Sequence, residues 1–135
     1  MANKLEQELQ ASITNIPECV AAGYVDLSTG MLLAIRTVDS HPQEILEMLA
    51  AATSDMFQGS NVVAIENMFK KARGVEDNAH YFNEMIVNSD NLIHIFIRGK
   101  ENQEHVVCFV CRKSANLGMA LTKARSSMPG LESSV

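Results

Sequence analysis

The side chains best suited to chemistry in this sequence are its three cysteines, two of which form the pattern Cys108-x-x-Cys111. A pair with this spacing is typical of redox sites and of zinc sites. The surrounding residues, HVVCFVCRK, predict a β-strand, in which residues three apart point to opposite faces of a sheet. Two thiols on opposite faces cannot share a metal ion or close a disulfide, so we expect buried, reduced thiols here.

The other reactive side chains form no recognisable catalytic or phosphate-binding motif. The sequence contains no G-x-S-x-G, no G-x-x-x-x-G-K-[ST] and no G-x-G-x-x-G. His94 lies between Ile93 and Ile95, where we expect a half-buried ring hydrogen-bonded at one nitrogen. The four histidines, at positions 41, 80, 94 and 105, lack metal-ligand spacing. We therefore predict no catalytic residue, no metal site and no cofactor.

Composition narrows the class of protein. The 135 residues, 47% apolar and 20% charged, predict a single globular domain over residues 1–135. A net charge of -5 argues against a nucleic-acid partner or an anionic membrane surface.

The N-terminal residues MANKLEQELQ lack the apolar core of a secretory signal, and no window reaches the roughly 20 apolar residues that cross a bilayer. We expect a cytoplasmic protein without membrane insertion.

Residues 20–36, VAAGYVDLSTGMLLAIR, predict a tight antiparallel hairpin that turns at Ser28, Thr29 and Gly30. Both arms are apolar on two sides, which is typical of strands in a sheet covered on both faces. The alternation of the first arm assigns Cys19, Gly23, Val25 and Leu27 to one face and Val20, Ala22 and Tyr24 to the other.

Periodicity and turn residues place the remaining elements. Ser40 and Gln43 resemble a capping box for the second helix, and Pro129 with Gly130 is expected to end the last one. Helices are expected over residues 3–15, 42–58, 61–73 and 114–128, and further strands over residues 81–87, 92–98 and 106–113. This order predicts an α+β fold, in which a five-stranded antiparallel sheet is sandwiched between helices.

Several segments together resemble the roadblock family of dynein light chains and their bacterial relatives. They are GYVDLSTGMLLAIR, EILEMLAAATSDMF, FNEMIVNSDNLIHIFIR and HVVCFVCRKSANLGMALTKA, with the small patterns D-x-x-T-G and A-N-L-G-x-A, and they span about residues 16–128. The resemblance implies a profilin-like roadblock architecture and a non-enzymatic adaptor. It also implies homodimers or paired heterodimers, formed by packing the long helix against its mate, and, for the bacterial relatives, partnership with a small Ras-like GTPase.

The residues themselves also indicate an association surface. The helix over 42–58 has a broad apolar arc, the strand over 81–87 is a candidate edge strand, and eight methionines suit an adaptable surface. Glu84 in that strand is expected to protect the sheet edge by its charge. The predicted partner-binding residues are Glu44, Ile45, Glu47, Met48, Leu49, Ala52, Asp55, Met56, Glu84 and Met85. Two alternatives remain open, a small-molecule sensor of profilin-, longin- or PAS-like shape and a thiol-dependent enzyme using Cys19, Cys108 or Cys111.

Overall fold

The structure is a computed structural model that describes residues 3–38, 43–77 and 79–135, without the side chains of Gln43, Ile45 and Leu46. Its elements are α1 (Lys4–Asn15), β1 (Cys19–Asp26), β2 (Met31–Thr37), α2 (Gln43–Gln58), α3 (Ser60–Arg73), β3 (Glu84–Asn88), β4 (Leu92–Arg98), β5 (His105–Arg112) and α4 (Leu117–Glu132). The strands form one antiparallel sheet in the order β2-β1-β5-β4-β3.

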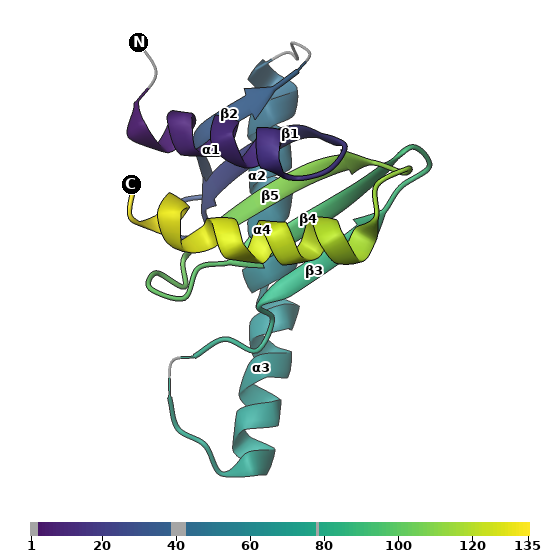
Figure 1. Ribbon diagram of the computed structural model, residues 1–135. Helices are drawn as coiled ribbons and strands as arrows, with labels where there is room; N and C mark the ends of the chain where they lie inside the picture. Colours follow the sequence, from purple (N-terminus) through teal and green to yellow (C-terminus); the bar gives the residue numbers. More distant parts are fainter. Residues whose placement is uncertain (1–2, 39–42, 78) are drawn as a thin grey trace.

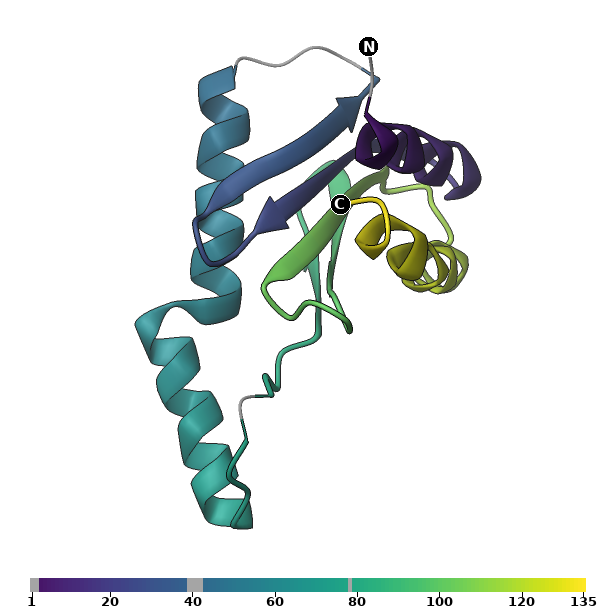
Figure 2. The same ribbon diagram turned by 90° about the vertical axis from the view of Figure 1, so that its left-hand side faces the viewer.

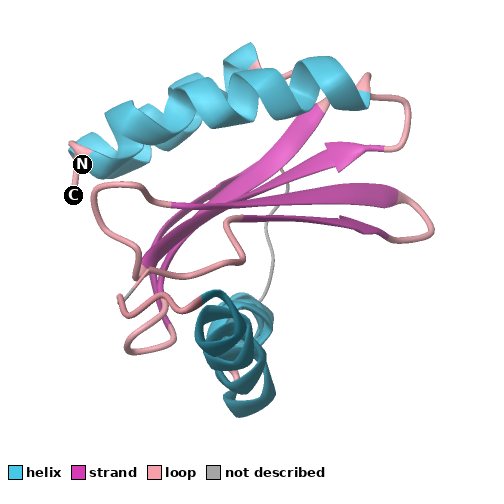
Figure 3. Cartoon of the chain, turned by 90° about the horizontal axis from the view of Figure 1, so that it is seen from below, coloured by secondary structure: helices cyan, strands magenta, loops and turns pink. Residues whose placement is uncertain are grey.

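The sheet separates two unequal helical layers (Figure 1). Helices α1 and α4 lie side by side on one face, whereas α2 crosses the other face, and α3 continues from the end of α2 beyond the edge of the sheet (Figures 2 and 3). The predicted α+β fold, with a five-stranded antiparallel sheet between helices, is confirmed.

Local signals set most element ends as predicted. Asn3 caps α1, because its side chain accepts a hydrogen bond from the Glu6 N–H at 2.8 Å. Gly30 in the hairpin turn and Gly74 after α3 both adopt positive φ, +71° and +69°, which a glycine does without strain. At the same turn, hydrogen bonds from Ser28 lower the pKa of Asp26. The predicted capping box of α2 includes Ser40, which lies outside the described residues.

Strand β3 is shorter than predicted, since it begins at Glu84 and not at residue 81. The Asn83 carbonyl still accepts the Arg98 N–H at 2.7 Å, but backbone groups of the two residues before Asn83 are bound by side chains. The Tyr81 N–H donates to the Glu66 carboxylate at 2.6 Å, and the Phe82 carbonyl accepts from the Arg98 guanidinium at 2.9 Å. These side-chain contacts replace the strand ladder, and Glu66 holds His80 and Tyr81 against α3.

Helix α4 begins at Leu117, three residues later than predicted, and continues through Pro129 to Glu132, four residues beyond the predicted end. Pro129 removes one helical hydrogen bond, but two tertiary contacts lie beyond it. Leu131 is completely buried in the core, and the Glu132 carboxylate accepts three backbone N–H bonds from residues 100–102, at 2.8–3.1 Å. These contacts outweigh the local stop signal.

The face predicted for Cys19 is wrong. The pairing of β1 with β5 shifts register between Cys19 and Ala21, and this irregularity interrupts the alternation of side chains. Cys19 therefore packs with Ala22 and Tyr24 under α1 and α4, while Val25 and Leu27 pack under α2. The opposite orientation of Cys108 and Cys111 is confirmed, since Cys111 lies in the core under α1 and α4 and Cys108 packs on the α2 side.

The main core lies between the sheet and the pair α1 and α4. Leu9, Ile95, Phe109 and Leu131 have no exposed surface there, and Tyr24 reaches the His105 ring with a 3.0 Å hydrogen bond. In the described part of the chain, no helix is long and apolar enough to cross a bilayer.

Candidate docking surface

Helix α2 is fixed to the sheet along only one of its sides. Ala50, Thr53 and Phe57 are buried against the sheet. The Leu27 carbonyl accepts hydrogen bonds from Ser54 Oγ at 2.9 Å and from Gln58 Nε2 at 2.8 Å. This side of α2 packs over β1 and β2. The neighbouring side of α2 faces the sheet across a groove.

An apolar groove runs between that neighbouring side and the sheet, with a hollow of about 340 Å³. Leu49, Ala52 and Met56 of α2 form one wall, and residues of β1, β2, β4 and β5 form the floor. The floor residues on β4 and β5 are Leu92, His94, Phe96, Cys108 and Val110. Among the described residues that line the hollow there is no Asp, Glu, Lys or Arg, so this surface favours an apolar occupant.

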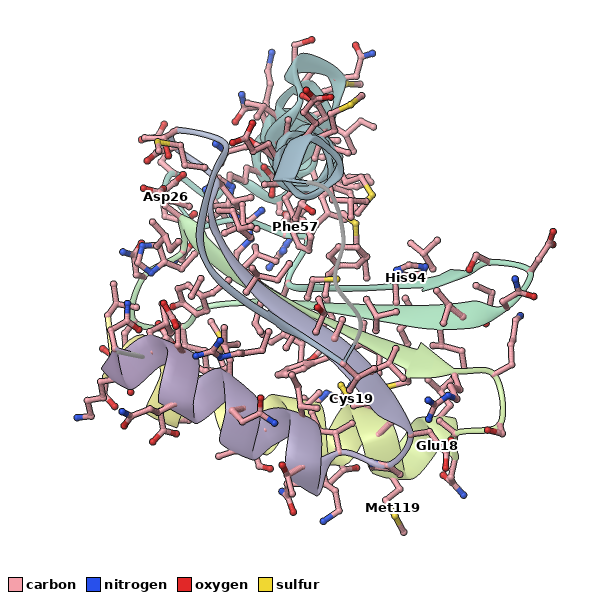
Figure 4. The ribbon with its side chains drawn as sticks, turned by 90° about the horizontal axis from the view of Figure 1, so that it is seen from above. Glu18, Cys19, Asp26, Phe57, His94 and Met119 are labelled. Carbon is pink, nitrogen blue, oxygen red and sulfur yellow. The ribbon has the colours of Figure 1, made fainter. Side chains whose placement is uncertain are left out.

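His94, the histidine that lines the groove, has surroundings that disfavour its charged form. Burial lowers the pKa of His94, whose ring stacks on Phe96 with 6.5 Å between ring centres. His94 Nε2 lies 3.3 Å from Ser89 Oγ, and this half-buried position with one hydrogen-bonded nitrogen is as predicted. Figure 4 shows His94 and Phe57 on the same side of the sheet.

The predicted partner-binding residues of α2 divide between the wall and the rim of this groove. Met48 and Leu49 are 72% and 56% exposed, which is unusual for large apolar side chains. Ala52 is exposed and Met56 is half-buried. Glu44, Glu47 and Asp55 are exposed on the outer side of the helix, and the side chain of Ile45 lies outside the described part of the chain.

The groove leads to the edge strand β3, which pairs with β4 alone in the described sheet. Met85 and Val87 lie opposite Phe96 and His94, on the groove side, and Val87 is 40% exposed. Glu84 points to the other side, where its carboxylate forms a two-pronged ion pair with Arg125 of α4, both distances being 2.7 Å. Glu84 therefore lies on the face of the sheet that α1 and α4 cover, and it does not line the groove.

Sequence reasoning missed how α3 is held. The predicted helix over residues 61–73 is confirmed, but Ile65, Met68 and Phe69 of its apolar stripe are 41–69% exposed. The buried residue is Glu66, at 2% exposure, which contacts His80 Nδ1 at 3.0 Å and accepts the Tyr81 N–H. Burial alone would raise the pKa of Glu66, but these hydrogen bonds and the His80 charge lower it below its ordinary value of 4.5.

Arg98 completes this polar attachment and ties α2 to the strands. It is 3% exposed and donates to the carbonyls of Phe57, Phe82 and residue 103 at 2.9–3.0 Å. Its guanidinium also lies over the Phe57 ring, 5.2 Å from the ring centre. No local sequence signal indicates these contacts, because their partners are 5–41 residues away.

The described thiols and acidic residues do not assemble into a metal-binding cluster. Burial raises the pKa of Cys108 to about 12, and the neighbouring Cys111 thiol together with burial raises the pKa of Cys19. Cys111, whose pKa is lowered by its contact with Cys19, is completely buried. Within residues 3–38, 43–77 and 79–135, no three His, Cys, Asp or Glu side chains are grouped so that they could hold a metal ion.

Comparisons with known proteins identify the fold. No protein-family model and no curated protein matches the chain. Among solved structures, MglB of Myxococcus xanthus superposes with a TM-score of 0.70 at 14% identity, covering 96% of this chain and 93% of its own. The gliding protein MglB of Thermus thermophilus gives 0.67 at 17% identity, with 95% and 85% covered.

A roadblock/LC7 domain from Streptomyces avermitilis superposes with a TM-score of 0.69 at 10% identity, and the match covers 98% of this chain and 97% of that domain. Identities this low show the fold alone. The chain has the roadblock/LC7 fold, and the resemblance that the sequence predicted is confirmed at that level.

Proposed function

We propose that residues 1–135 are a single roadblock-like domain that acts as a non-enzymatic dimeric adaptor, in which helix α2 of a second copy fills the groove beside α2. The observation that carries the proposal is the exposed apolar surface of α2 at that groove, where Leu49 lines the hollow at 56% exposure and the adjacent Met48 is 72% exposed. Exposed apolar surface of this kind marks interaction sites on soluble proteins.

A second copy suits the groove because the interface would be isologous, so that each residue contributes twice. Burying one Leu or Met side chain contributes about 1.5–3 kcal/mol, and the wall of each copy offers several. The edge strand β3 adjoins the groove and presents unpaired backbone groups along its outer side in the described sheet. The likeness to roadblock folds, whose family forms such dimers, supports the same arrangement.

The adjacent residues Ala51 and Ala52 provide a matched test of the dimer. Both are exposed on α2, but only Ala52 lines the groove. Light scattering should give twice the mass of one chain for the wild type and for Ala51→Glu, and the mass of one chain for Ala52→Glu. An unpaired charge in a desolvated interface explains the loss. A monomeric wild type at tens of micromolar, or the same mass for both variants, would contradict the dimer.

The partner proposed for the dimer is a Ras-like small GTPase, on the resemblance to the bacterial roadblock proteins. An adaptor that acts on a GTPase must contact its GTP and GDP states differently, because only a difference in affinity shifts that equilibrium. The exposed acidic rim of α2, Glu44, Glu47 and Asp55, is placed to meet a basic surface and to accelerate association. Any catalytic groups for GTP hydrolysis would then belong to the GTPase.

Binding of Ras-like GTPases loaded with a GTP analogue or with GDP tests this partner. We expect tighter binding to one state, and an association rate about tenfold slower for the variant Glu44→Gln, Glu47→Gln, Asp55→Asn, with the preference between states retained. Equal binding to both states, or binding to neither, would contradict the GTPase partner and leave the dimer standing.

The hollow also favours one alternative, a sensor of a small apolar molecule, since about 340 Å³ lies at the lower end of ligand-pocket volumes. The two functions differ in their dependence on protein concentration. A sensor would be stabilised by an apolar ligand in a thermal-shift screen at any protein concentration. In the dimer, the partner's side chains occupy the groove, and stability rises with protein concentration without ligand. The thiol-enzyme alternative gains no support, because burial and raised pKa values disfavour an accessible thiolate at Cys19 and Cys108.

A further inference from the structure

Two of the three cysteines, separated by most of the chain, meet across the sheet. Cys19 opens β1, Cys111 lies near the end of β5, and the two residues are direct partners in the antiparallel pairing. Both side chains point into the core under α1 and α4, where Cys19 is 8% and Cys111 0% exposed. Figure 4 shows where Cys19 lies, directly after Glu18 at the start of β1.

The backbone hydrogen bonds identify which kind of pair this is. The Arg112 N–H donates to the Glu18 carbonyl at 3.0 Å, and the Cys19 N–H donates to the Ile16 carbonyl at 3.3 Å rather than across to Cys111. Cys19 and Cys111 therefore occupy a non-hydrogen-bonded position, at which opposing Cα atoms are about 4.5 Å apart and side chains are closest. That separation lies within the range that a disulfide spans, about 4.4–6.8 Å.

The two thiols influence each other's ionisation. The Cys19 thiol donates to the Ala21 carbonyl at 3.3 Å, and the proximity of the two sulfurs raises the pKa of Cys19 and lowers the pKa of Cys111. Cys111 is thus the thiol of the pair whose ionisation is favoured. A thiolate next to a thiol is the arrangement required for stepwise disulfide exchange.

We propose that Cys19 and Cys111 form a dithiol site that a low-molecular-weight disulfide, such as oxidised glutathione, converts into an intrachain disulfide. The Cys111 thiolate attacks one sulfur of the reagent, which forms a mixed disulfide and releases one small thiolate. Cys19 then loses its proton and attacks the Cys111 sulfur, and the second small thiolate leaves. The two cysteines are oxidised by two electrons, and one reagent disulfide is reduced to two thiols.

The reagent reaches the site through local opening at the start of β1. Strand ends open at lower cost than strand centres, and this end carries two local weaknesses. Glu18 adopts φ +57°, an uncommon value for a residue other than glycine, and the register shifts between Cys19 and Ala21. We expect slow oxidation of the native protein and faster oxidation in sub-denaturing urea.

The third cysteine serves as an internal control. Cys108 lies on the opposite face of the sheet, on the α2 side, so it cannot pair with either of the other two without breaking β5. A disulfide between Cys19 and Cys111 closes a long loop of chain and constrains the unfolded state, which stabilises the fold. It lies away from the groove beside α2, so it is independent of the proposed dimer.

The test is to incubate the native protein with excess oxidised glutathione and to measure intact mass, peptide map and thermal unfolding. We expect a mass lower by two hydrogens without a glutathione adduct, a mapped bond between Cys19 and Cys111, and a midpoint higher by about 5 °C or more. Cys108→Ser should behave as the wild type. Cys19→Ser should give only a glutathione adduct on Cys111 or no reaction.

Two results would overturn the proposal. One is a mapped disulfide that includes Cys108 within the chain. The other is three free thiols that persist after prolonged incubation in sub-denaturing urea, because local opening then exposes the pair without oxidation following. Neither result bears on the mass of the dimer, so failure here is distinct from failure of the proposed function.

Discussion

The two faces of the sheet are completed in different ways. On the covered face, α1 and α4 lie side by side over a continuous apolar core in which Leu9 and Phe109 have no exposed surface (Figure 3). On the open face, a single helix covers part of the sheet, and Leu49 of that helix is 56% exposed. The covered face therefore contains the main hydrophobic core of the chain, whereas the open face leaves apolar side chains of α2 exposed.

The attachment of the helices differs between the faces as well. Apolar burial dominates under α1 and α4, whereas α2 and α3 are also held by side-chain hydrogen bonds. Ser54 and Gln58 donate to the Leu27 carbonyl, Arg98 of β4 donates to the Phe57 carbonyl, and Glu66 accepts the Tyr81 N–H. Apolar burial changes little with pH, but a buried carboxylate responds to it. The comparison thus predicts that the two layers respond differently to the same perturbation.

The largest expected effect comes from truncating a matched pair of leucines, one on each face. Leu9→Ala removes a fully buried side chain and should lower the free energy of unfolding by about 2–5 kcal/mol at every protein concentration. Leu49→Ala should cost less than about 1 kcal/mol in dilute protein, because half of the side chain is already in water. Its cost should grow with concentration, as the dimer forms.

Urea denaturation at two protein concentrations measures both variants. Equal losses of unfolding free energy for Leu9→Ala and Leu49→Ala in dilute protein would contradict this difference between the faces. They would mean that the groove wall is already part of the core of a single chain. If the cost of Leu49→Ala in unfolding free energy does not depend on protein concentration, Leu49 is not buried by a second copy of the chain.

The sequence predicts elements well where local signals suffice. The strand over residues 92–98 has the predicted bounds, because an apolar run lies between turn formers, and α3 ends before Gly74 as predicted. Prediction from the sequence fails where a contact with a residue distant in the sequence determines the end of an element. Leu131 and Glu132 extend α4 beyond Pro129, and Arg98 and Glu66 take the backbone groups that would have lengthened β3. A single sequence contains no sign of those pairings.

The candidate site divides in the same way. The broad stripe of α2 predicts an apolar surface that its own sheet does not cover, and the exposure of Met48 and Leu49 agrees with that prediction. The predicted partner-binding role of Glu84 stays a prediction, and its ion pair with Arg125 of α4 was not foreseen, because Arg125 lies 41 residues away. The burial of Glu66 was not predictable either, since its position alone reads as the solvated side of a helix.

The next largest effect is expected at Glu66 and should depend on pH. The folded-state pKa of Glu66 lies below its ordinary value of 4.5, so its contribution to stability is present above that value and is lost as the pH falls through the folded pKa. Glu66→Gln should cost about 1–3 kcal/mol at pH 7, because the buried contacts with His80 and Tyr81 lose their charged acceptor. The cost should shrink as the pH falls from about 5 to 3.

Glu104→Gln is the matched control, because the Glu104 carboxylate lies 3.6 Å from the other ring nitrogen of His80 and is 41% exposed. Its cost should be smaller than that of Glu66→Gln. Hydrogen exchange should show that acid loosens α3 before α4. A cost for Glu66→Gln that stays constant between pH 7 and 3, or simultaneous loosening of both helices, would contradict the polar attachment of the open face.

The smallest expected effect is the absence of any zinc dependence. It concerns Cys108 and Cys111, which lie on opposite faces of the sheet. Cys108 packs on the open side of β5 and Cys111 on the covered side, so the Cys-x-x-Cys pattern cannot present both sulfurs to one ion. The purified protein should carry far less than one zinc ion per chain by metal analysis, and neither added zinc nor a chelator should change the midpoint of thermal unfolding. Cys108→Ser, the control, should leave the metal content unchanged. A stoichiometric zinc ion that is lost in this variant would refute the division of the two thiols between the faces, because tetrahedral coordination would require β5 to leave the sheet at this point.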